Sequence, residues 1–121
     1  MNYAAHAYAK VAKETASPRE LEANLLLKAA AKLQAAQDAW PEKSAEFKDA
    51  ILYNRKLWTV LLDSVLREDN QLPPPVRSNI RDLGMFVMNE TFAAMTKPTL
   101  NQIKAMIKVN RGIASGLRSK A

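Results

Sequence analysis

The sequence predicts an all-α protein, a compact antiparallel bundle of about five helices. Only three of the 121 residues are glycine, whereas alanine, leucine and lysine, which favour helices, are abundant. Apolar residues recur at steps of three and four along most of the chain, and prolines interrupt the pattern at short connections. Short connections favour antiparallel neighbours. No linker separates two regions, so residues 1–121 are interpreted as a single domain.

The first two helices are expected at residues 2–14 and from Pro18 to about Ala39. The Ser-Pro-Arg-Glu motif at 17–20 is typical of a helix start, because serine can cap, proline fits the first position and glutamate completes a capping box. Pro41 ends the second helix. The expected inner face of this helix consists of Leu21, Leu25, Ala29, Leu33, Ala36 and Trp40.

The third helix is expected from near Ser44 to a turn at Glu68-Asp69-Asn70. Its apolar stripe is wide and leaves only a narrow polar edge, which is typical of a helix at the centre of a bundle. The stripe contains Phe47, Ile51, Trp58, Leu61, Leu62 and Val65, flanked by Tyr53 and Leu57.

Two further helices are expected over about 75–96 and from Thr99 to about Gly116. Consecutive prolines precede the first of them, and Thr99 with Gln102 forms a capping-box pattern at the start of the second. Gly116 is the expected end signal. The expected inner faces are Val76, Ile80, Leu83, Val87 and Ala94 in one helix, and Leu100, Ile103, Ile107 and Ala114 in the other.

The net charge of +6 arises entirely from the end of the chain. All 12 acidic residues lie within residues 1–96 together with 12 of the 18 basic residues, so the excess (18 − 12 = 6) lies in the last 25 residues. Lys104, Lys108 and Arg111 fall on one strip of the last helix. This strip can face water, an acidic protein or RNA. No aromatic residue follows Lys97, which argues against direct contact with nucleic acid.

The sequence lacks the residues that most catalytic and metal sites need. It contains no cysteine, and the single histidine, His6, has no evident acid–base partner. The three glycines are isolated, so no phosphate-binding loop exists. We therefore expect no enzymatic activity, no metal and no cofactor. No apolar run is long enough for a membrane span or a signal peptide, so we expect a cytoplasmic protein without membrane insertion.

The fourth helix carries a second apolar stripe, formed by Met85, Met88, Phe92 and Met95. Two apolar faces need two neighbours, so the helix either packs on both sides within the bundle or offers a groove to an amphipathic segment of another protein. Methionine side chains repack readily around varied partners. These four residues are candidate partner-binding residues. The candidate charged contacts to acidic groups of the partner are Arg55, Lys104, Lys108 and Arg111.

Asn54 and Asn110 each fall near the middle of an apolar stripe, and each precedes an arginine. Polar groups at such positions must find hydrogen-bond partners. We expect both side chains to bond backbone atoms of loops or helix ends and to fix the register of the helices. The alternative is that they anchor a bound peptide.

Four strings of the sequence share their order and spacing with one known family. They are Ser17-Pro18-Arg19-Glu20-Leu21-Glu22-Ala23; Tyr53-Asn54-Arg55-Lys56-Leu57-Trp58; Leu72-Pro73 with Val76-Arg77 and Asn79-Ile80; and Val109-Asn110-Arg111 with Ile113-Ala114 and Gly116-Leu117. In this order they resemble FlaF, the flagellar biosynthesis regulator of alphaproteobacteria, over about Tyr3 to Leu117. Pro75 and the basic ending Arg118-Ser119-Lys120 depart from the family pattern.

The resemblance implies a cytoplasmic factor that promotes flagellin production and export. On the family's account it binds flagellin as a secretion chaperone, and the helical terminal segments of flagellin are the expected ligand. FlbT, a repressor that acts on flagellin messenger RNA, and the flagellar export apparatus are further expected partners. The alternative function is post-transcriptional regulation, in which the chain contacts flagellin mRNA directly or through FlbT.

Overall fold

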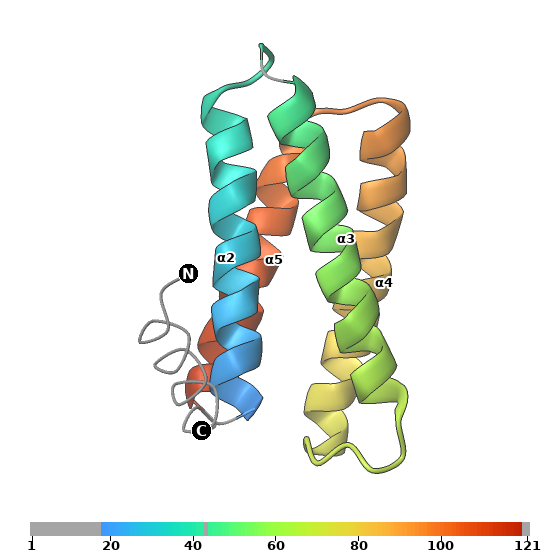
Figure 1. Cartoon of the computed structure of the whole chain (residues 1–121). Helices are drawn as coiled ribbons and strands as arrows, with labels where there is room; N and C mark the ends of the chain where they lie inside the picture. Colours follow the sequence, from blue (N-terminus) through green and yellow to red (C-terminus); the bar gives the residue numbers. More distant parts are fainter. Residues whose placement is uncertain (1–17, 43, 120–121) are drawn as a thin grey trace, which may run out of the picture.

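A computed structural model describes residues 18–42 and 44–119 of the chain (Figure 1). These residues form four α-helices and no strand, which confirms the predicted all-α bundle. The helices are α2 (Pro18–Asp38), α3 (Ser44–Leu66), α4 (Pro74–Thr96) and α5 (Leu100–Ser119). The other expected helix, at 2–14, lies outside the described residues, as do the Ser17 cap and His6.

The four helices run alternately up and down, so each is antiparallel to the next (Figure 1). The most extensive packing is between α2 and α5, while α3 packs against both α2 and α4. The contact between α4 and α5 is much smaller. The bundle can therefore be described as two pairs, α2 with α5 and α3 with α4. They are joined through α2 and α3, whose contact is about as extensive as that between α3 and α4.

Small side chains allow α2 and α5 to approach each other closely. Most of the buried side chains of α2 are alanines, and α5 contributes the fully buried Ala114. The expected inner face of α2 is correct at Ala29, Leu33 and Ala36 but wrong at Leu25, which is exposed. Leu26 is buried instead, because it continues the helical spacing of the residues facing the core. The buried residues of α2 are Ala23, Leu26, Ala29, Ala30, Leu33 and Ala36.

The start of α5 agrees with the sequence prediction, but its end does not. The Thr99 backbone nitrogen donates to Oε1 of Gln102 at 2.8 Å, and the Gln102 nitrogen donates to Oγ1 of Thr99 at 3.4 Å, which confirms the capping box. The helix continues past Gly116 to Ser119. Leu117 is buried there, and this apolar anchor extends the helix beyond a residue that often ends one.

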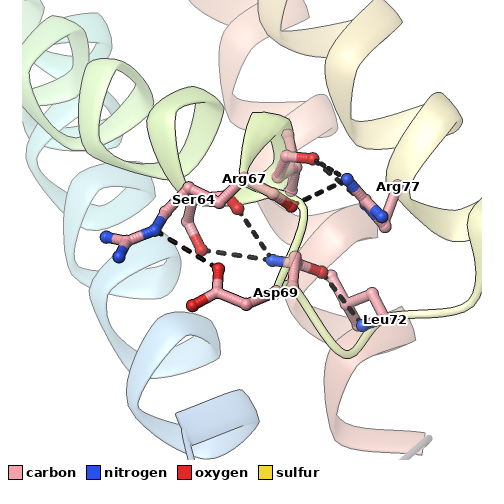
Figure 2. Close-up of polar contacts among 7 residues, drawn as sticks. Ser64, Arg67, Asp69, Leu72 and Arg77 are labelled. Carbon is pink, nitrogen blue, oxygen red and sulfur yellow. Dashed lines mark hydrogen bonds and ion pairs between the residues drawn. The ribbon is translucent and has the colours of Figure 1, made fainter.

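Side chains of α4 and of the connecting loop satisfy the C-terminal end of α3 (Figure 2). Nε and Nη2 of Arg77 donate to the carbonyl of Val65 at 3.1 and 2.9 Å, and Nη2 also donates to the carbonyl of Arg67 at 2.9 Å. Nδ2 of Asn70 donates to the carbonyl of Ser64 at 3.0 Å. The last carbonyls of a helix have no partner within it, so these contacts cap α3 and fix the start of α4 against it.

The pKa of Glu22 in α2 is raised, because burial disfavours its charged form. The Arg19 guanidinium, 3.7 Å away, lowers the pKa but offsets only part of the effect of burial. Its Oε1 is buried without a hydrogen-bond partner among the described residues. In the folded state Glu22 thus keeps its proton to a higher pH than a carboxyl with the ordinary pKa of 4.5. The stabilising effect of protonation is present below that value and is lost as pH rises through the raised pKa.

We expect Glu22→Gln to unfold at a higher urea concentration than the native chain at pH 7, because it removes a half-buried charge. Well below pH 4.5 the native carboxyl is protonated in both states, so the two unfolding midpoints should converge there. Urea titrations followed by circular dichroism at the two pH values measure the difference. A variant that is less stable at pH 7 would contradict the burial argument and assign the larger role to the Arg19 contact.

Candidate functional site

The methionine and phenylalanine stripe of α4 lies largely at the surface. Phe92 is 76% exposed, Met85 55% and Met95 49%, while Met88 is half-buried against the core. The helix is therefore not packed on both sides within the described bundle. The side of α4 that faces the core carries Ile80, Gly84, Val87, Thr91 and Ala94.

Residues of α3 complete this surface. Leu52 is 38% exposed, and the exposed Arg55 lines a hollow of about 480 Å³ together with Met88, Phe92 and Met95. We call this surface the α3–α4 face. It consists of Leu52 and Arg55 of α3 and Met85, Met88, Phe92 and Met95 of α4. The sequence prediction included its α4 residues and Arg55 but missed Leu52. The pattern of α3 predicts a central helix with only a narrow polar edge, and the exposed side of α3 is wider than that.

Two more hollows lie along the same seam between α3 and α4. One, of about 300 Å³, adjoins the first at Met95 and is lined by Lys48 and Leu52 on the side of α3. The other, of about 320 Å³, lies farther along the seam and is lined by Leu66 of α3 and Arg81 of α4. The seam is thus concave and largely apolar in its first two hollows.

Cations border all three hollows. Arg55 and Lys48 line one hollow each, Arg77 and Arg81 both line the third, and no aspartate or glutamate lines any of them. Arg81 is engaged locally, because its Nε lies 3.5 Å from Oδ1 of Asp82 and its Nη2 donates to Oγ of Ser78 at 3.1 Å. The side chains of Lys48 and Arg55 form no hydrogen bond or ion pair with the described residues. The apolar surface is therefore accompanied by unpaired positive charge.

The other predicted cations lie on a different part of the bundle. Lys104, Lys108 and Arg111 are exposed on α5, which packs mainly against α2. Nη2 of Arg111 donates to Oε1 of Gln34 at 3.4 Å, which ties this cation to α2. No residue of α5 lines the three hollows of the α3–α4 seam. The structure thus places Arg55 beside the stripe and separates it from the three cations of α5.

A glycine sets the spacing of α3 and α4 along the seam. A Cβ atom at Gly84 would lie 2.5 Å from Cδ2 and 2.8 Å from Cγ of Leu62. These distances are far below van der Waals contact, so Leu62 occupies the space that any larger residue would need. The close approach holds the antiparallel helices α3 and α4 side by side at this point.

Behind the face, the two predicted asparagines form a buried chain of hydrogen bonds. Nε1 of Trp58 donates to Oδ1 of Asn110 at 2.8 Å, and Nδ2 of Asn110 donates to Oδ1 of Asn54 at 2.7 Å. Nδ2 of Asn54 then donates to the sulfur of Met106 at 3.6 Å. Thr91 of α4 lies 3.7 Å from the same sulfur, so the chain connects α3, α5 and α4.

The expected partners of the asparagines are therefore wrong, because each amide bonds side chains rather than the backbone of loops or helix ends. Both residues have 0% exposure, which leaves no access for a bound peptide. Asn54 and Trp58 lie on α3 and Asn110 lies across the bundle on α5. Side chains of the opposite helix satisfy both amides, and this fixes the register of the two helices.

A further hollow, which the sequence prediction missed, lies between α4 and α5. Its volume is about 380 Å³, and Gly112 and Gly116 border it. A Cβ added at either glycine would meet no atom within 4 Å. The two residues were interpreted as isolated glycines, but their spacing of four places them on the same side of α5. The remaining lining residues are Leu72, Pro75, Val76, Asn79, Ile80, Ile113 and Leu117.

The described residues contain neither a candidate metal cluster nor a candidate membrane-spanning helix. Within residues 18–42 and 44–119, no three histidine, aspartate or glutamate side chains lie where they could hold one metal ion. In the same part of the chain, no helix combines the length and the apolar run that crossing a membrane requires.

Comparison with known proteins gave one result. The family model described as "Flagellar protein FlaF" matches residues 4–117, nearly the whole chain. No curated protein and no solved structure matched. The matched range contains every residue of the α3–α4 face and the buried asparagine pair.

We expect the two substitutions Gly84→Ala and Gly112→Ala to have opposite signs. Alanine gains about 1 kcal/mol of helix propensity over glycine at either site. At position 84 the clash with Leu62 outweighs this gain, because overpacking costs about 1–3 kcal/mol. Thermal unfolding of both variants measures the effect, and stabilisation by Gly84→Ala would show that α3 and α4 are not held in close contact there.

We expect Asn110→Leu to destabilise the fold by about 2–4 kcal/mol, because it leaves the Trp58 N–H and the Asn54 carbonyl oxygen buried without partners. The control is Asn89→Leu, the same change at an exposed position of α4, which should change stability by less than about 0.5 kcal/mol. Denaturant titration measures both, and equal effects would refute the role of the buried chain.

Proposed function

Because the chain belongs to the FlaF family of flagellar proteins, we propose that it is a cytoplasmic flagellin-binding secretion chaperone that promotes flagellin synthesis and export. The observation that carries the proposal is the α3–α4 face, where three large apolar side chains of α4 are about half or more exposed. Exposed apolar surface of this kind, next to concave hollows, is typical of a protein–protein contact.

The proposed action is stoichiometric shielding. A flagellin helix that lies on the face removes its own apolar side chains and those of Phe92 and Met95 from water. Full burial of one such side chain contributes about 1.5–3 kcal/mol before the cost of ordering the complex is subtracted. Flagellin held in this way stays soluble and ready for export, and regulation follows from the amount that remains unbound.

The side chains of the face suit a helical ligand. Amphipathic helices bind in apolar grooves through residues spaced three and four apart, and two methionines, Met88 and Met95, line this groove. Their flexible, polarizable side chains adapt to ligands of varied shape. We therefore propose the helical terminal segments of flagellin as the ligand.

A second candidate function is post-transcriptional regulation through direct contact with flagellin mRNA or through FlbT. Lys104 and Lys108 favour it, because both are exposed on α5 and form no ion pair with the described residues. No aromatic residue of α5 accompanies them, which weakens the case for stacking on bases. Salt separates the two functions, since RNA affinity falls steeply with added salt and an apolar contact does not.

We expect Phe92→Ser combined with Met95→Ser to weaken flagellin binding at least tenfold, because both side chains are exposed and line one hollow. Titration of purified flagellin, at two salt concentrations, measures the affinity. Helicity should be unchanged, which circular dichroism checks.

The matched control is Phe86→Ser, an exposed phenylalanine of the same helix that lies outside the α3–α4 face. It should bind flagellin like the native chain. If the native chain fails to bind flagellin at all, the chaperone function is rejected. If Phe86→Ser weakens binding as much as the double variant, the location of the site is wrong.

A further inference from the structure

We propose that the α3–α4 face recognises one amphipathic helix whose apolar stripe carries two acidic side chains along one edge, about two helical turns apart. The inference rests on flagellin binding as the proposed function. It specifies the chemistry of the segment that the face binds and the orientation of that segment along α3.

The shape of the surface fits a single helix. The hollows lined by Arg55 and by Lys48 adjoin at Met95, and the third hollow continues along the same seam. From Met85 to Met95 the stripe of α4 covers ten residues, or about 15 Å at 1.5 Å per residue. A partner helix of about three to four turns that lies in the seam between α3 and α4 covers this length.

The charges specify the edge of that helix. Lys48 and Arg55 are exposed, line the two adjoining apolar hollows and have no partner among the described residues. A bound apolar helix removes water from both cations, and a cation that loses water without gaining a counter-charge opposes binding. A carboxylate opposite each of them provides the counter-charge. Arg81, at the far hollow, already has Asp82 beside it.

The spacing of the two cations specifies the spacing of the carboxylates. Lys48 and Arg55 are seven residues apart on α3, which places them on the same side of the helix and about 10.5 Å apart along its axis. A partner helix that runs alongside α3 matches them with acidic residues seven positions apart. The acidic edge of the partner therefore faces α3, and its apolar stripe faces Met88, Phe92 and Met95 of α4.

An anionic lipid surface is the other ligand that combines apolar and negative groups. The observations favour a helix, because the apolar side chains line hollows between two helices rather than a convex ridge. In addition, the two unpaired cations lie on the α3 side of the seam only.

The first test uses synthetic helical peptides of 18 residues with one shared apolar stripe. One peptide carries two glutamates seven positions apart along the edge of the stripe, and the other carries lysines there. We expect the full chain to bind the glutamate peptide at least tenfold more tightly. The preference should be lost in Lys48→Glu/Arg55→Glu and kept in Lys104→Glu/Lys108→Glu, which changes the net charge equally at another face.

Three results would overturn the inference. The first is equal affinity of the native chain for both peptides, a comparison that needs no variant to fold. The second is the same loss of preference in both double variants, which would indicate attraction by net charge alone. The third is binding to phosphatidylglycerol vesicles, abolished by Lys48→Glu/Arg55→Glu, in a chain that binds neither peptide.

The same three proteins are then titrated with full-length flagellin. If flagellin does not bind the native chain while the glutamate peptide does, the proposed function fails and the recognition chemistry is supported. If flagellin binds all three proteins equally, the proposed function is supported and the inference is overturned. A selective loss in Lys48→Glu/Arg55→Glu supports both.

Discussion

The hydrogen bonds of Asn54, Asn110 and Trp58 at the centre of the bundle are the constraint on which the rest of the structure depends. Aliphatic side chains tolerate sliding of one helix past another, because one apolar contact replaces a similar one. Buried amides do not, because a displacement of one turn leaves each of them without a partner. The chain joins α3 to α5 across the bundle, where direct helix packing is slight. It therefore selects one arrangement among several that would bury the same apolar residues.

The two helix pairs use this fixed arrangement in different ways. In the α2–α5 pair, alanines allow the backbones to come close together, and most of the apolar side chains of that pair are buried in the core. In the α3–α4 pair, Gly84 permits a close approach at Leu62. The large side chains of the α4 stripe are not covered by another described helix, so they stay largely in contact with water. The other side of α4 already fills the interior of the bundle. The stripe is exposed because no space in the core remains for a second apolar side of this helix.

Much of the fold was predictable from the sequence because helix boundaries have local chemical causes. The capping box at Thr99, the prolines before α4 and the spacing of Ala29, Leu33 and Ala36 each act within a few residues. The end of α5 was not predictable in this way, since the burial of Leu117 depends on packing with other helices.

The candidate site was predictable only where one helix determines it. The α4 stripe follows from spacing along a single segment, but the positions of Leu52 and Lys48 beside it depend on how α3 is rotated about its own axis. The partners of the asparagines were missed for the same reason. Residues 52 or more positions apart in the chain meet there, and no local pattern indicates which amide faces which.

The capping of α3 by Arg77 has a consequence for how the molecule divides into parts. Its bonds to Val65 and Arg67 join residues only 12 and 10 positions apart, so little chain entropy is lost in closing this hairpin. The pairing of α2 with α5, in contrast, closes a loop that includes almost the entire described chain. Fraying of that long-range pairing leaves the hairpin's own closure in place. The surface carried by the hairpin is therefore the part of the described bundle that depends least on contacts between distant parts of the chain.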